Sequence, residues 1–256
     1  MNETRSDGFL DGRLRLTQPA RGYRAGADAV MLAAACPARP GDAVLELGCG
    51  AGVASLCLGW RVPDLRLTGI ELQAEYADLA RQNAAHSGIA MTVIDGDLTQ
   101  MPAVLRDVTF DQVIANPPYF TGSTAGPDAG RATARHETAP LGAWVDAGLR
   151  RLRPGGVVTL ILRADRLDGL IAALAGRAGD IAILPIAARA GRDAGRVIVT
   201  ARKGARGALR LLAPFILHAG AAHLSDAEDM TPQAAAILRG GMPINLKVYE
   251  TGVTES

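Results

Sequence analysis

The sequence has few cysteines, few aromatic residues and almost no lysine. Its three cysteines, Cys36, Cys49 and Cys57, form no CxxC or CxxxH pattern, so the 256 residues predict neither a disulfide framework nor a zinc site. Only Lys203 and Lys247 are lysines, and the net charge of +1 provides no general attraction to a polyanion. A nucleic-acid partner would therefore have to meet a local cluster of arginines.

Long apolar segments are also missing. The first seven residues contain no hydrophobic signal-peptide core, and no run approaches the roughly 18 apolar residues that a membrane-spanning helix needs. Together with a cysteine pattern that suits a reducing compartment, this predicts a cytoplasmic protein without a membrane segment or a metal. With 48% hydrophobic residues, the chain is long enough to bury the core of one large domain.

Short apolar runs alternate with helical segments along most of the chain. We expect strands at 42–47, 65–70, 90–95, 110–115, 156–162, 181–188, 196–202 and 209–217. We expect helices at 29–36, 52–60, 73–87, 101–106, 140–152 and 165–176. Nearly continuous Val, Ile and Leu in the early strands favours a parallel sheet covered on both faces, and the loop 189–195 predicts a hairpin. The expected fold class is a doubly wound, mostly parallel α/β sheet of seven strands with an antiparallel edge hairpin.

Single residues predict several helix boundaries. Asp28 is placed to cap the helix 29–36 and Pro37 to end it. Gly88 is a plausible C-cap for the helix 73–87. Thr231 followed by Pro232 indicates the start of a last helix.

A glycine-rich turn follows the first of the predicted parallel strands. Glycines at 48, 50 and 52 let the backbone pass close to a ligand, and the next helix offers free amides at its N-terminus. A dinucleotide-binding turn has Gly or Ala at the sixth position of its motif, where this chain has Val53. The three glycines, with Glu46 two residues before the first, instead resemble motif I of class I S-adenosylmethionine-dependent methyltransferases.

This resemblance implies a cofactor site at three strand ends. Glu46 would meet the methionine end of S-adenosylmethionine, and Cys49 would fill a small position without chemistry of its own. Glu71 would accept hydrogen bonds from both ribose hydroxyls. Asp97 would bind the adenine amine, and the backbone amide of Leu98 would meet the ring. Three carboxylates would thus end three adjacent strands.

A second motif, Asn116-Pro117-Pro118-Tyr119, follows the strand predicted at 110–115. Two consecutive prolines fix two φ angles and donate no hydrogen bonds, so the Asn116 side-chain oxygen and the Pro117 carbonyl can both accept from one NH2 group. An amine held in this way can turn its lone pair toward a sulfonium methyl, while Tyr119 stacks on the planar group. The motif resembles motif IV of amino-methyltransferases that act on adenine N6, cytosine N4 or a protein glutamine amide.

The N-terminal segment favours one branch of these enzymes. Gln18, Gly22-Tyr23-Arg24 and Asp28 resemble a segment of the bacterial tRNA adenine-N6 methyltransferases that modify the adenine 3′ of the anticodon in a valine tRNA. The resemblance implies one domain over 1–256, in which 1–40 close over the cofactor, 41–162 bind it, and 163–256 add the antiparallel part and the tail. Arg24 could pair with the methionine carboxylate, whereas Asp28 is favoured as a helix cap. The expected cofactor-binding residues are Arg24, Glu46, Gly48, Cys49, Gly50, Gly52, Glu71, Leu72, Asp97, Leu98 and Asn116.

Two regions are candidates for contact with RNA. The loop after Tyr119 ends in an Ala-Arg-His-Glu stretch that is similar to one in the same family, so Arg131 and Arg135 could contact phosphates and His136 could orient the loop. The alternative is a solvated, charged helix start. Near the predicted hairpin, seven basic residues and Asp193 carry a net charge of +6, which could follow a phosphate backbone or form a solvated face. The seven are Arg189, Arg192, Arg196, Arg202, Lys203, Arg206 and Arg210.

Other functions stay open beside tRNA adenine-N6 methylation. Protein glutamine-N5 methyltransferases share the Asn-Pro-Pro-Tyr turn but carry a large helical domain before the glycine turn, where this chain has 47 residues. Ribosomal RNA guanine-N2 methyltransferases usually have Phe at the position of Tyr119. A non-catalytic RNA-binding module with a retained cofactor pocket would not need Asn116 and Glu46, and a nicotinamide-dependent dehydrogenase is disfavoured by Val53. The low aromatic content leaves the identity of the RNA open.

Overall fold

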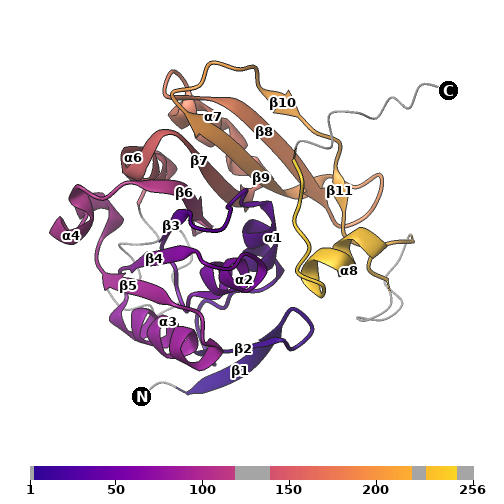
Figure 1. The fold of residues 1–256 in the computed structure, drawn as a ribbon. Coiled ribbons are helices and arrows are strands. Elements are labelled where there is room, and N and C mark those ends of the chain that lie inside the picture. Colours follow the sequence, from indigo (N-terminus) through magenta and orange to yellow (C-terminus); the bar gives the residue numbers. More distant parts are fainter. Residues whose placement is uncertain (1–2, 119–138, 221–228, 247–256) are drawn as a thin grey trace.

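A mixed β-sheet forms the centre of the protein (Figure 1). The computed structural model describes residues 3–118, 139–220 and 229–246. The sheet order is β10-β8-β9-β7-β6-β3-β4-β5, and β11 also pairs with β8. The strands are β3 (Ala43–Leu47), β4 (Arg66–Glu71), β5 (Met91–Asp95), β6 (Phe110–Ala115), β7 (Leu152–Arg163), β8 (Ala178–Ala187), β9 (Ala194–Lys203), β10 (Arg210–Leu211) and β11 (Phe215–Ile216).

The strand directions confirm the expected fold class. β3 to β7 are mutually parallel, and β9 runs antiparallel to both of its neighbours, β7 and β8. The seven longer strands, β3 to β9, correspond to the first seven of the eight expected strands, and the two-residue strands β10 and β11 extend the edge, each parallel to β8. The single strand expected at 209–217 is therefore wrong. Its sequence is interrupted at Pro214, which has no backbone N–H to donate to a strand ladder.

Helices cover both faces of the sheet and bury two separate apolar clusters. One cluster involves α1, α2, α8 and the N-terminal residues, and the other involves α6 and α7. The helices are α1 (Ala27–Ala35), α2 (Val53–Arg61), α3 (Ala74–Ser87), α4 (Ala103–Arg106), α6 (Leu141–Arg151), α7 (Leu167–Leu174) and α8 (Pro232–Leu238), with 3-10 turns η1 (Leu98–Gln100) and η2 (Ala164–Arg166). This is the two-sided cover that continuous Val, Ile and Leu strands require.

An N-terminal hairpin was missed by the sequence analysis. β1 (Thr4–Phe9) and β2 (Leu14–Pro19) pair antiparallel and form a separate two-stranded sheet. In β2, Leu14, Leu16 and Gln18 are buried and alternate with less buried residues. The hairpin lies beside α3, against which β2 packs (Figure 1). It therefore places the next residues of the chain near the start of α3.

The predicted helix boundaries are confirmed except at Asp28. Gly88 adopts a left-handed C-cap conformation with φ 67°, and the Thr231 hydroxyl caps α8 by accepting from the Ala234 N–H. Helix α1 begins earlier than expected, with Gly26 at its N-cap, so Asp28 lies inside the first turn. Its carboxylate accepts a hydrogen bond of 3.0 Å from Nε of Arg196 on β9. The cap assigned to Asp28 is therefore wrong.

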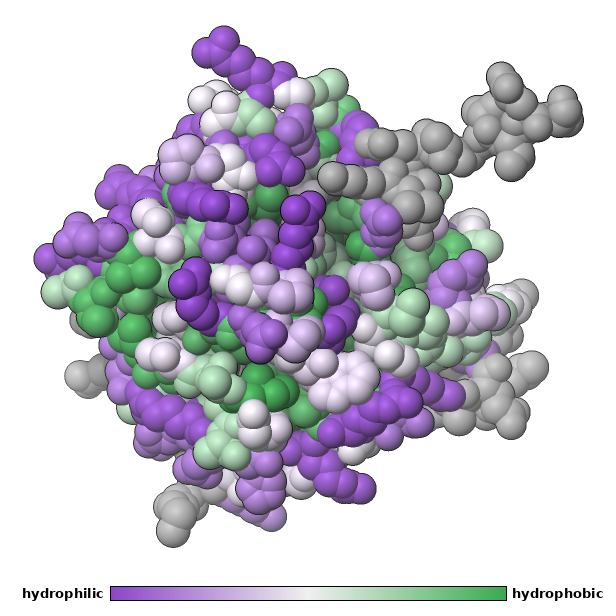
Figure 2. Space-filling view, in the orientation of Figure 1, coloured by the Kyte–Doolittle hydropathy of each residue, from purple (hydrophilic) through white to green (hydrophobic). Residues whose placement is uncertain are grey.

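The exposed surface in the view of Figure 2 mixes hydrophilic and apolar residues. Purple hydrophilic side chains are spread among smaller green areas, rather than separated from one broad apolar face. None of the described helices is both long enough and apolar enough to cross a membrane.

Candidate active site

The glycine turn between β3 and α2 needs glycine for its backbone geometry. Gly48, Gly50 and Gly52 have φ of 61°, 54° and 82°, in the left-handed region that other residues rarely adopt. A Cβ on Gly52 would lie 3.3 Å from the Cβ of Ala80 on α3. The turn can therefore pass close to a ligand only because these three positions carry no side chain.

Glu46, next to the turn, is a buried acid with an unusual proton affinity. Its side chain is 4% exposed, and Oε2 accepts hydrogen bonds from the Ser55 backbone N–H at 2.9 Å and from the Ser55 hydroxyl at 2.5 Å. Burial raises the pKa of Glu46 to about 8, although the bonds from Ser55 oppose that rise. A cationic ligand group beside it would favour the ionised form. Ser55 was not predicted as a site residue.

Glu71 and Asp97 stabilise the neighbouring backbone at the ends of the next two strands. Oε2 of Glu71 accepts from the Gly50 N–H at 2.8 Å, and its Oε1 accepts from the Gln73 N–H at 2.9 Å. Oδ1 of Asp97 accepts from the N–H and the hydroxyl of Thr99. Because β3, β4 and β5 are consecutive in the sheet, the three acids lie at or just beyond the carboxyl ends of three adjacent strands, as predicted.

A pocket at this edge of the sheet brings several of the predicted residues together. Glu46, Gly48, Cys49 and Asn116 all line it. The other lining residues are Gln18, Tyr23, Ala25, Ala29, Ala51, Val53, Ala54 and Tyr76. Glu71, Leu72, Asp97, Leu98, Gly50 and Gly52 are not among the residues that line this pocket. Gln18, Tyr23 and Tyr76 were not assigned to the site from the sequence, although Gln18 and Tyr23 belong to the segment that carried the resemblance.

Cys49 is buried in the wall of this pocket. Its side chain is 5% exposed, and burial raises the pKa of the thiol well above its ordinary value. The reactive form of a cysteine is the thiolate, which this environment disfavours. Its geometry therefore agrees with a packing role.

Asn116 follows β6, which is paired with β3, so it lies beside the glycine turn. Its Nδ2 donates a hydrogen bond of 3.1 Å to the hydroxyl of Tyr23. Two residues later, the carbonyl of Pro118 accepts a hydrogen bond of 2.8 Å from Nη1 of Arg166 in η2. Pro117 is buried between them. Tyr119, Arg131, Arg135 and His136, which were predicted to contact the substrate, lie outside the described residues.

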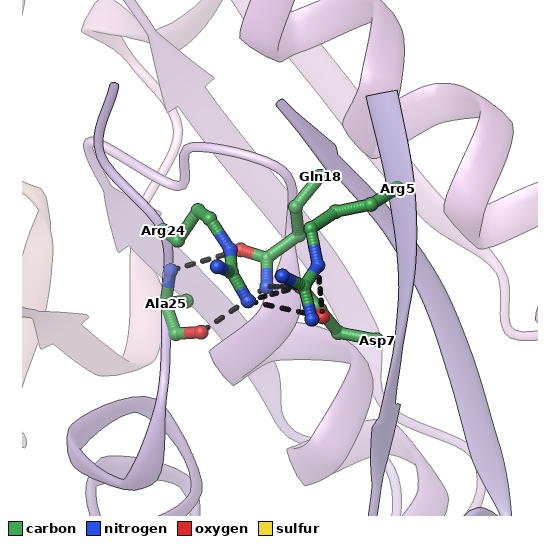
Figure 3. Close-up of polar contacts among 5 residues, drawn as sticks. All are labelled: Arg5, Asp7, Gln18, Arg24 and Ala25. Carbon is green, nitrogen blue, oxygen red and sulfur yellow. Dashed lines mark hydrogen bonds and ion pairs between the residues drawn. The ribbon is translucent and has the colours of Figure 1, made fainter. Parts of the chain in front are cut away.

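Arg24 is held by the N-terminal hairpin (Figure 3). Its Nη2 lies 3.0 Å from both carboxylate oxygens of Asp7, which also accepts from Nε of Arg5 and Nε2 of Gln18. The methionine carboxylate was expected as its partner, and in this structure Asp7 takes that place. Arg24 therefore fastens the loop between β2 and α1 to β1.

Comparison with known proteins identifies the family of this chain. Residues 26–165 match the family model of the methyltransferase small domain. The chain belongs to this family. It is 33% identical over 174 residues to a tRNA1(Val) (adenine(37)-N6)-methyltransferase of Porphyromonas gingivalis, covering 64% of this chain and 68% of that one. It is also 30% identical over 208 residues to the enzyme of that name in Aeromonas hydrophila, covering 78% and 85%.

Solved structures share the fold of this methyltransferase. A predicted O-methyltransferase of Agrobacterium tumefaciens matches with a TM-score of 0.68 and 28% identity over 85% of this chain and 98% of that one. A precorrin-6y C5,15-methyltransferase of Geobacter metallireducens matches with a TM-score of 0.51 and 16% identity, over 73% and 93%. The second likeness concerns the fold alone.

The family of this methyltransferase implies S-adenosylmethionine as its cofactor, and the chemistry of the pocket suits the methionine end of that molecule. Glu46 is a desolvated carboxylate in the pocket wall, and the ammonium of the methionine moiety is the kind of cation that would favour its ionised form. Glu71 ends β4 and Asp97 follows β5, the next two strands of the sheet. Among the described residues, no group of three or more His, Cys, Asp and Glu side chains could hold a metal ion.

The basic residues predicted as one cluster are divided between two edges of the sheet. Arg163 at the end of β7 pairs with Arg196 at the start of β9, whereas Val157 pairs with Arg202. Arg189, Arg192 and Arg196 are therefore on the active-site edge, and Arg202, Lys203 and Arg206 are toward the opposite one. The expectation of a single basic surface is wrong, because the strand β9 separates its two halves.

Most of these cations also have partners within the protein. Arg189 pairs with Asp229, Arg196 with Asp28, and Arg202 with Asp180. Lys203 donates to the Leu152 carbonyl and Arg210 to that of Leu246. Arg192 and Arg206 are exposed. Much of the predicted positive charge thus stabilises the fold.

Proposed function

We propose that this protein transfers a methyl group from S-adenosylmethionine to N6 of an adenine in tRNA, at position 37 of tRNA1(Val). The observation that carries the proposal is the position of Asn116, in one pocket with Glu46 and the glycine turn. The two relatives described above are named for this reaction. Chemistry at the site and sequence likeness therefore support the same activity.

Different residues would bind the cofactor and orient the substrate amine in this reaction. When bound, S-adenosylmethionine supplies an electrophilic methyl group on its sulfonium. Glu46 would hold the methionine ammonium, and Glu71 and Asp97 would hold the ribose and the adenine. The Asn116 side-chain oxygen and the Pro117 carbonyl accept the two hydrogens of the substrate amine. They hold its lone pair toward the methyl group, so the rate gain comes from orientation. The substrate nitrogen would gain the methyl group and lose one proton to water, with S-adenosylhomocysteine as the leaving group.

The remaining predicted residues complete the proposal on the substrate side. Tyr119 would stack on the adenine once it is turned out of the anticodon loop, a step that single-stranded bases make at low cost. Arg131 and Arg135 would contact phosphates near that base, and His136 would orient their loop. Arg192, which is exposed on the active-site edge, could extend this contact.

The paired acceptors favour a nitrogen over an oxygen acceptor. The Agrobacterium tumefaciens neighbour is named as a predicted O-methyltransferase. A hydroxyl carries one hydrogen, so it can use only one of the two acceptors at Asn116 and Pro117, whereas an amine uses both. An alcohol would also need a base to take its proton, and the two neutral acceptors at Asn116 and Pro117 are not bases.

Transfer of a labelled methyl group tests the proposal. The protein is incubated with labelled S-adenosylmethionine and separate tRNA, ribosomal RNA and protein fractions from cells that lack the enzyme. We expect label in tRNA, recovered as N6-methyladenosine after digestion. Label in protein alone would support glutamine methylation instead, and label in N2-methylguanosine would support the ribosomal RNA alternative.

A further inference from the structure

Tyr23 links the N-terminal segment to the proposed catalytic Asn116. Its hydroxyl accepts the 3.1 Å hydrogen bond from Nδ2 of Asn116, although the two residues are 93 positions apart. The Tyr23 side chain lines the same pocket as Glu46 but is 52% exposed overall. A half-exposed ring gains little from apolar burial, so packing alone does not account for its position.

Three contacts hold Tyr23 in this position. Its backbone carbonyl accepts a hydrogen bond of 3.0 Å from the Tyr76 hydroxyl at the start of α3. Gln18, which is 1% exposed, bonds both the N–H and the carbonyl of Ala25 with its side-chain amide. Arg24 is paired with Asp7 on β1 (Figure 3). The loop between β2 and α1 is thus fastened at Tyr23 and at the two residues after it. These contacts hold the Tyr23 hydroxyl at a defined position beside Asn116.

The contact with Tyr23 restricts the movement of the Asn116 carboxamide. The hydrogen bond uses Nδ2, whereas a substrate amine would donate to Oδ1 of the same group. Because both atoms belong to one rigid planar group, holding Nδ2 at the Tyr23 hydroxyl also limits where Oδ1 can lie. A substrate amine would therefore meet its acceptor at a restricted position.

We propose that Tyr23 is a positioning residue that holds the Asn116 carboxamide in place for methyl transfer. This inference rests on the proposed function, because it needs Asn116 to receive a substrate amine. Although the residue is half exposed, desolvation of its hydroxyl group, and the nearby carboxylates of Asp28 and Glu46, raise the pKa of Tyr23 well above its ordinary value of 10.0. The hydroxyl therefore keeps its proton throughout the neutral range, and its effect on the rate is independent of pH there.

The variant Tyr23→Phe tests the role because it removes the hydroxyl and keeps the ring. We expect kcat to fall about tenfold, while KM for tRNA and the Kd for S-adenosylhomocysteine change by less than about twofold. Ser87→Ala is the control, because it removes a hydroxyl that bonds only the Ala84 carbonyl at the far end of α3. An unchanged kcat in Tyr23→Phe would overturn the proposal. A raised Kd for S-adenosylhomocysteine together with a normal kcat at saturating substrates would also overturn the proposal. Tyr23 would then only cover the cofactor.

A spectroscopic measurement keeps the inference separate from the proposed function. In 15N-labelled protein, the side-chain amide signals of Asn116 are assigned by their loss in Asn116→Ala. Tyr23→Phe should shift these signals and accelerate their exchange with water several-fold. Unchanged amide signals would contradict the contact with Tyr23. Absence of RNA methylation by the wild-type protein would instead contradict the proposed function, whatever the amide signals show.

Discussion

In the wild type, a rising pH should lower the free energy of unfolding and tighten cofactor binding, because both depend on the proton of Glu46. Replacement of Glu46 by Gln should remove both effects. Burial raises the pKa of this carboxyl from an ordinary value of 4.5 to about 8 in the folded protein. The substitution keeps the side-chain volume and an oxygen that can accept from Ser55, but it removes the ionisable group. Glu46→Gln thus isolates the contribution of one proton.

The stability effect follows from the difference between the folded and unfolded pKa values. Between 4.5 and 8, the folded state binds more protons at Glu46 than the unfolded state does. The contribution of protonated Glu46 to the free energy of unfolding is therefore fully present below pH 4.5 and is lost as the pH rises through 8. Between pH 6.5 and 8.5, the wild type should lose roughly 2 kcal/mol more of its free energy of unfolding than Glu46→Gln. Urea unfolding at the two pH values measures this difference.

Cofactor binding should improve over the same pH range. Glu46 is about 3% ionised at pH 6.5 and about 75% ionised at pH 8.5 if its pKa is 8. If only the ionised form binds the ligand ammonium, the Kd for S-adenosylhomocysteine should fall about 25-fold in the wild type between these two pH values. Titration calorimetry on both proteins measures it. A Kd that is independent of pH in the wild type, or that changes equally in Glu46→Gln, would refute this account of the pocket.

Other substitutions test the turn, the loop and the charged edges. Gly52→Ala should lower the free energy of unfolding, measured in urea, by roughly 1–2 kcal/mol more than Gly88→Ala does. Both glycines have positive φ, but only a Cβ at position 52 would crowd a neighbouring residue. Arg166→Met removes the bond to the Pro118 carbonyl, so kcat should fall about fivefold with unchanged Kd for S-adenosylhomocysteine, and an unaltered kcat would argue against a role of that bond. Arg192→Ala should weaken tRNA binding and reduce its dependence on salt between 50 and 200 mM, whereas Arg206→Ala on the opposite edge should not; equal effects would place the RNA elsewhere.

The core of the site could be predicted because it depends on local sequence and on one general property of parallel sheets. Glu46 and Gly48 belong to one strand and its turn, and Asn116 directly follows another strand. The carboxyl ends of parallel strands meet at one edge of the sheet, so these residues come together without further information. The left-handed φ of Gly48 confirms why that position carries glycine.

The N-terminal part could not be predicted to the same depth. β1 is mostly exposed, so it gives no alternation of apolar residues, although Asp11-Gly12 beside β2 is a recognisable hairpin signal. The contact between Tyr23 and Asn116 joins distant segments, and no local pattern encodes it. The prediction of a single basic surface was wrong for a related reason. The ten residues of β9 span roughly 33 Å, so charges that are close in sequence lie on opposite edges.

Methylation of a tRNA1(Val) transcript by the wild type and by Asn116→Ala tests the central claim most directly. Both proteins are saturated with labelled S-adenosylmethionine, and the modified nucleoside and its position are identified after digestion. The account predicts N6-methyladenosine at position 37 with the wild type. It predicts almost none with Asn116→Ala, although that variant binds S-adenosylhomocysteine normally. Undiminished transfer by Asn116→Ala, or a methyl group on any atom other than adenine N6, would contradict it.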